Sequence, residues 1–82
     1  MMYQLSWKIL PGLRGLSCSE FSAAPTQAPD NERGVAVELA GDAERDALVQ
    51  LLESHFAAQR FSNNAVAFEA VKAFVVEWAG KR

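Results

Sequence analysis

The sequence predicts an α+β fold: a small, mostly antiparallel sheet in β-β-β-α-α order, covered on one face by a C-terminal helical hairpin. Three observations predict this class. Residues 2–10 alternate between apolar and polar side chains, as a half-buried strand does. Residues 42–60 and 63–79 repeat apolar side chains at helical spacing. A chain of 82 residues with 22% charged residues and a net charge of −2 suits one small globular domain, residues 1–82.

The predicted strands span about residues 2–10, 14–21 and 35–40. Pro11-Gly12 is a turn dipeptide, so the first two strands are expected to form a hairpin, with a bulge near Arg14-Gly15. Glu20 and Phe21 swap the phase of the second strand's alternation. Four apolar side chains of the first strand share the side expected to lie beneath the helices: Tyr3, Leu5, Trp7 and Ile9.

Residues 22–34 form a predicted loop that is longer than most connections. It contains two of the three prolines and the turn-like pair Asp30-Asn31. Two interpretations stay open: a mobile connector, or a recognition loop that uses Asp30, Asn31, Glu32 and Arg33.

The first predicted helix, residues 42–60, begins at Asp42, which is a favourable N-cap residue. Its apolar side chains recur at helical spacing and are expected in the core: Leu48, Leu51, Leu52 and Phe56. A short connection then leads to the second helix, so the two helices are expected to be roughly antiparallel neighbours.

The second helix, residues 63–79, is apolar around most of its circumference. Ser62, Asn63 or Asn64 can cap its start, and Gly80 is expected just past its end. If the sheet and the first helix cover only part of it, an apolar patch stays exposed, drawn from Val66, Ala70, Ala73, Val76 and Trp78. In the alternative, a small core uses all of these side chains, and Trp7 and Trp78 are core residues.

Residues with catalytic or metal-binding chemistry are few. Cys18 is the only thiol and His55 the only histidine, and nothing in their spacing favours a nucleophile–base pair over ordinary packing. One cysteine and one histidine do not make a structural zinc site of the usual composition. The glycines form no phosphate-binding loop, so no cofactor is expected.

The expected location is the cytoplasm. A single cysteine allows no intramolecular disulfide, and the N-terminus lacks the pattern of a signal peptide. No apolar run approaches the length of a membrane span, so no membrane partner is expected. The net charge of −2 argues against general binding to nucleic acid, which requires a basic face.

These observations favour a non-enzymatic protein–protein interaction module, with self-association as a homodimer also considered. Inhibitors, adaptors and accessory proteins of bacteria, plasmids and phages are often of this size, which is an association and not a physical argument. The candidate interface residues are Asp30, Arg33, Val66, Val76 and Trp78.

Two further hypotheses belong to other classes. The first is binding of a small ligand or nucleic acid on the polar face of the sheet, through Gln4, Ser6, Lys8 and Arg14. It is weakened because the aromatic residues Tyr3 and Trp7 are predicted on the opposite face. The second is a small enzyme that uses Cys18 and His55. A separate arginine cluster for an acidic ligand, drawn from Arg14, Arg33, Arg45 and Arg60, is a weaker alternative to ordinary solvated arginines.

Overall fold

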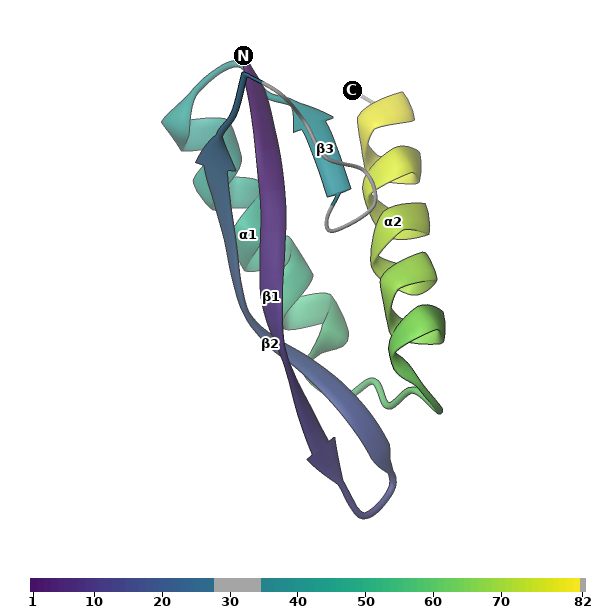
Figure 1. Cartoon of the computed structure of the whole chain (residues 1–82). Helices are drawn as coiled ribbons and strands as arrows, with labels where there is room; N and C mark the ends of the chain where they lie inside the picture. The colour runs from purple at the N-terminus through teal and green to yellow at the C-terminus, as the bar shows by residue number, and fades with distance from the viewer. Residues whose placement is uncertain (28–34, 82) are drawn as a thin grey trace.

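The computed structural model describes residues 1–27 and 35–81 and has the predicted β-β-β-α-α order (Figure 1). The three strands form one antiparallel sheet in the spatial order β2-β1-β3. The elements are β1 (Met2–Gly12), β2 (Gly15–Pro25), β3 (Val35–Glu38), α1 (Asp42–Phe56) and α2 (Asn64–Gly80).

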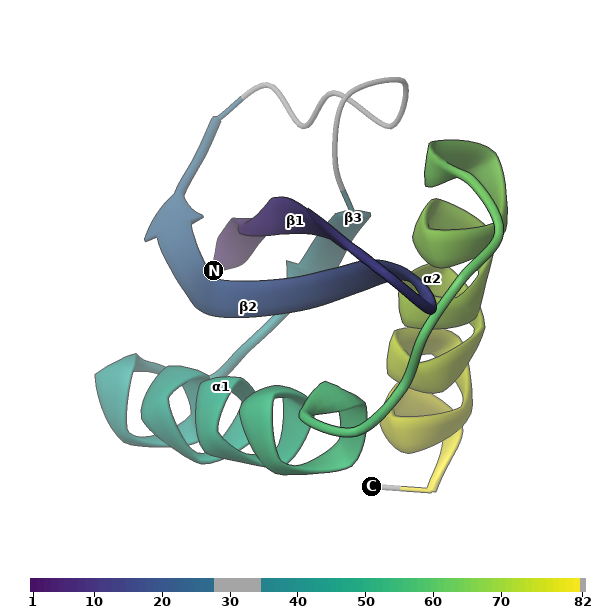
Figure 2. The same ribbon diagram turned by 90° about the horizontal axis from the view of Figure 1, so that it is seen from below.

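Both helices pack against the face of the sheet that carries Tyr3, Leu5 and Phe21, and they share one core with it. Helix α1 lies mainly on β2, whereas α2 lies against β3 and β2. The helices form a hairpin, but Figure 2 shows that their axes diverge, which differs from the expectation that they are roughly antiparallel neighbours. They meet where the ring of Phe74 contacts the rings of His55 and Phe56.

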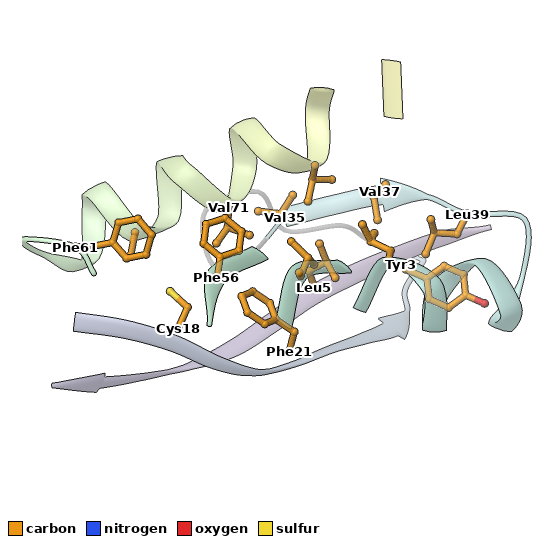
Figure 3. Close-up of a cluster of buried hydrophobic side chains, with 14 residues drawn as sticks. Tyr3, Leu5, Cys18, Phe21, Val35, Val37, Leu39, Phe56, Phe61 and Val71 are labelled. Carbon is orange, nitrogen blue, oxygen red and sulfur yellow. The ribbon is translucent and has the colours of Figure 1, made fainter. Parts of the chain in front are cut away.

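The core runs lengthwise between the sheet and the helices (Figure 3). The predicted inner face of β1 is confirmed, because Tyr3 and Leu5 are fully buried and Trp7 and Ile9 pack at the margin. The predicted apolar face of α2 is also buried or half-buried. The buried side chains are Tyr3, Leu5, Cys18, Phe21, Val35, Val37, Leu39, Leu48, Leu52, Phe56, Phe61, Ala67, Val71 and Val75.

A β-bulge explains the phase swap in the second strand. The register shifts between Ser6 and Lys8 of β1, where β2 places both Glu20 and Phe21 opposite a single residue. Glu20 has a φ of 52°, in the left-handed region. The extra residue turns Phe21 back into the core, so the bulge lies at Glu20 and the prediction near Arg14-Gly15 was wrong.

The hairpin turn and the end of β2 also differ from the prediction. Leu13 and Arg14 form the turn, and β2 extends to Pro25, so residues 22–25 are strand and not loop. The predicted recognition residues Asp30 and Arg33 lie outside the described residues.

Helix α1 ends at Phe56, four residues before its predicted end at Arg60. The chain after it returns to the sheet, where Phe61 forms an isolated bridge with Leu16 of β2. At the other end of α1, the N-cap residue is Gly41, which makes no side-chain capping bond. The prediction of Asp42 as N-cap was therefore wrong: its carboxylate instead accepts a hydrogen bond from the Tyr3 hydroxyl at 3.0 Å.

The ends of α2 follow the prediction more closely. Asn63 is the N-cap, and its Oδ1 accepts a hydrogen bond from the Val66 amide at 2.9 Å. Gly80 is the last residue inside the helix, not the first beyond it, and Lys81 follows in a right-handed conformation.

Candidate interaction groove

An open groove of about 440 Å³ lies where α1 and α2 diverge. It forms because α1 packs mainly on β2 whereas α2 packs on β3 and β2, and the axes of the two helices diverge (Figure 2). We call this site the helix groove. Its lining is mostly apolar and comprises Leu51, His55, Ala70, Ala73, Phe74, Glu77, Trp78 and Lys81.

Leu51 is the main apolar contribution of α1 to the helix groove. Sequence periodicity predicted that it is buried, but its side chain is 45% exposed. Leu48 and Leu52 lie on the same helix and are fully buried. Leu51 lines the helix groove together with residues of α2, and the divergence of α2 leaves it uncovered.

His55 lies in the last turn of α1 and packs its ring against two aromatic rings. The ring centroids are 4.6 Å from Phe74 and 4.8 Å from Phe56. The sequence favoured a partly buried histidine at a helix–sheet edge. The ring does pack against these two aromatic rings, but the residue is exposed, so the predicted burial was wrong. In this position His55 forms part of the wall of the helix groove.

The charged groups of the helix groove neutralise each other. Lys81 Nζ lies 3.1 Å from Glu77 Oε1, one turn earlier on α2, and both side chains are exposed. Such a surface pair contributes little to stability. Because Glu77 and Lys81 carry opposite charges, this pair adds no net charge to the groove lining.

The interface residues predicted on α2 lie at different positions around the helix. Trp78 lines the helix groove. Val66 is 45% exposed and lies about one helical turn before Ala70, which also lines the groove. Val76 is 63% exposed but lies about 160° around the helix from Trp78. Sequence analysis missed Leu51 and Phe74 as exposed or half-exposed groove residues, because both occur at core-like spacing.

Cys18 and His55 lie in different environments. Cys18 is buried in the core beside Phe56 and Phe61 (Figure 3). Burial raises the pKa of its thiol, which favours the protonated, less nucleophilic form at neutral pH. His55 instead faces the helix groove.

The polar face of the sheet is arranged as predicted. The hydroxyls of Ser6 and Ser22 are 2.9 Å apart across the strands, and Lys8 pairs with Glu20 at 3.4 Å. The aromatic residues of β1 face the other way: Tyr3 is 1% exposed, and the ring of Trp7 contacts Phe21 and Phe68. This facing removes Tyr3 and Trp7 as stacking platforms for single-stranded nucleic acid on the polar face.

Arg45 lies apart from the other two described arginines, Arg14 and Arg60. Arg45, at the start of α1, lies 3.5 Å from Asp42 and 3.1 Å from Asp46, and the hydrogen bond to Asp46 raises the pKa of its guanidinium. Arg60 follows α1 and donates to the backbone carbonyls of Ala57 and Gln59. Arg14 lies in the turn between β1 and β2, and Figure 1 shows this turn and the start of α1 at opposite ends of the molecule. These three arginines do not make one anion site.

Among residues 1–27 and 35–81, no group of three or more histidine, cysteine and carboxylate side chains is placed to hold a metal ion. No helix within the same ranges is long and apolar enough to span a membrane. No protein-family model, curated protein or solved structure matches this chain.

Proposed function

We propose that this protein is a non-enzymatic interaction module that binds a helix of a partner protein in the helix groove. The observation that supports the proposal is the exposed apolar lining between α1 and α2, to which Leu51, Phe74 and Trp78 contribute. Exposed apolar surface bounded by polar residues is typical of protein-binding sites. Tryptophan is also enriched among the residues that dominate binding energy.

The walls of the groove favour a helical partner segment. Both walls are helices, whose backbone hydrogen bonds are satisfied internally, so an extended segment would find no backbone ladder to join there. A helix satisfies its own backbone and contributes only side chains. Because Glu77 and Lys81 neutralise each other, the segment that fits best presents uncharged apolar anchors at helical spacing.

Affinity capture with a matched pair of variants tests the proposal. The protein is tagged at its C-terminus, expressed in its source organism and purified beside Ala73→Arg and Val76→Arg. Both substituted positions are exposed on α2, but only Ala73 lines the helix groove. Each arginine should leave the thermal unfolding curve nearly unchanged, because neither side chain belongs to the core.

We expect a stoichiometric partner with the wild type and with Val76→Arg, and at least about a tenfold loss with Ala73→Arg. A partner captured equally by all three proteins would exclude the groove as the binding site. A wild type that purifies alone would contradict the proposal as a whole.

A further inference from the structure

Strand β1 is central in the sheet for only part of its length. Strand β3 pairs with Met2 to Leu5 of β1 and then ends, whereas β2 accompanies β1 to Gly12. Among the described residues, no strand covers the β3 side of β1 from Ser6 to Gly12. We call this stretch the open edge.

The hydrogen-bonding groups along the open edge follow from the alternation of β1. The Leu39 amide bonds to the Met1 carbonyl on the β3 side, and the Thr26 amide bonds to the Met2 carbonyl on the β2 side, both at 2.9 Å. Odd-numbered residues therefore direct their backbone groups toward the β3 side. Along the open edge these are the N–H and C=O groups of Trp7 and Ile9, and the C=O group of Pro11.

A second, smaller cavity of about 340 Å³ lies beside the open edge. It is bounded by the start of α2 and by the part of β1 that β3 leaves uncovered. Its lining comprises Ser6, Trp7, Ile9, Asn64, Ala65 and Phe68. The backbone groups that no described strand pairs therefore lie next to this partly apolar cavity.

We propose that a second copy of this chain pairs with the open edge, β1 against β1 in antiparallel orientation, with the two-fold axis at Ile9. This self-association uses a different surface from the helix groove and goes beyond the function proposed above. Unpaired strand edges are ready templates for pairing with another chain. In a two-fold contact the same surface serves both copies.

The length of the open edge fits a second copy. With the axis at Ile9, Ser6 of one copy lies opposite Gly12 of the other, so the paired stretch ends where β3 begins and where the hairpin turns. Ile9 exchanges both of its backbone hydrogen bonds with Ile9 of the second copy. The Trp7 amide donates to the Pro11 carbonyl of the second copy, and the ladder ends there because proline has no N–H.

The side chains are also compatible with this register. Lys8 lies opposite Leu10 of the second copy, so no like charges face each other directly. Leu10 is 47% exposed in the single chain, and the aliphatic stem of that lysine would cover it. A contact of this size is small, so we expect a dissociation constant of about 1–100 μM.

A disulfide placed on the two-fold axis tests the register. Opposed residues of a hydrogen-bonded antiparallel pair have Cα atoms about 5.5 Å apart, a separation that a disulfide spans. In a Cys18→Ala background, Ile9→Cys should oxidise to a covalent dimer at least about tenfold faster than Leu13→Cys. Leu13 is fully exposed at the hairpin turn and lies outside the paired stretch, so it reports random collision.

Sedimentation of non-covalent variants provides a second measurement that does not depend on cysteine. Leu10→Lys would face Lys8 of the second copy and should weaken the dimer at least about tenfold, whereas Leu13→Lys should not. Both positions are exposed, so both variants should fold. A wild type that stays monomeric up to about 1 mM would overturn the proposal. Equal oxidation of the two cysteine variants, or a dimer unaffected by Leu10→Lys, would also overturn it.

Discussion

The two outer edges of the β1–β2 hairpin differ in how far other parts of the described chain pair with them. On the β2 side, Leu16 and Phe61 exchange backbone hydrogen bonds of 2.8 and 2.9 Å. Farther along β2, the bulge at Glu20 disrupts the edge, and Pro25 ends the strand without an amide donor. On the β1 side, Trp7 and Ile9 have no strand neighbour among the described residues beyond β2.

This difference shows which edge of the sheet carries features that hinder pairing with another strand. Bulges and prolines are common devices against unwanted strand pairing, and both occur on β2. The corresponding stretch of β1 has one proline, Pro11, at its far end. Among the described residues, the β2 edge is therefore covered by Phe61 and interrupted by the bulge and Pro25, whereas Ser6 to Leu10 of β1 carries none of these features on its outer side.

The largest expected effect is on stability and comes from a substitution at Gly15, next to the bridge between Leu16 and Phe61 on the β2 edge. This residue has a φ of +119°, and a Cβ placed on it would lie 2.6 Å from the Phe61 carbonyl oxygen. Gly15→Ala should lower the free energy of unfolding by about 2–4 kcal/mol, because the backbone is strained and the bridge to Phe61 must shift. Urea unfolding followed by circular dichroism measures the loss.

Gly12→Ala is the matched control on the other strand of the same turn. A Cβ there would lie 3.4 Å from the Gly15 carbonyl oxygen, which is a tolerable contact. We expect a change of less than about 1 kcal/mol. Equal decreases in the free energy of unfolding for the two variants would show that stability depends on the turn itself and not on the contact between Gly15 and Phe61.

Sequence predicted the elements of this fold because their signals are local. The alternation in β1 and the helical spacing in α2 identify the buried face of each element, to which Leu5 and Val71 belong. Even the bulge left a signal, since Glu20 and Phe21 break the alternation at the point where the register shifts. The prediction nevertheless placed the bulge near Arg14-Gly15.

The helix groove and the open edge could not be predicted in the same way. The exposure of Leu51 depends on the directions that α1 and α2 take, and those are set by which strands they cover. The open edge depends on where β3 stops relative to β1, which is a pairing between residues far apart in sequence. Neither property is contained in the periodicity of one segment.

The part of β1 that β3 does cover should respond to alkaline pH. Burial, and then the hydrogen bond from the Tyr3 hydroxyl to Asp42, raise the pKa of Tyr3 above its ordinary value of 10.0. The folded state therefore disfavours the phenolate, so the stabilisation is fully present below about pH 10 and is lost as pH rises through the folded pKa. Tyr3→Phe should make the free energy of unfolding less dependent on pH between about 9 and 11. An unchanged slope in that variant would show that other groups control the alkaline transition.

The smallest expected effect concerns Ser19, beside the bulge on β2. Its Oγ is buried and has no hydrogen-bond partner among the described residues. A desolvated hydroxyl without a partner costs free energy, so Ser19→Ala should raise the free energy of unfolding by about 0.5–1 kcal/mol. Ser22→Ala is the control, because its hydroxyl is exposed and its bond to Ser6 competes with water, and we expect a change within about 0.5 kcal/mol. Chemical denaturation measures the free energy of unfolding of both variants. If Ser19→Ala is the less stable of the two, the Ser19 hydroxyl makes a stabilising hydrogen bond in the folded protein, and the prediction is wrong.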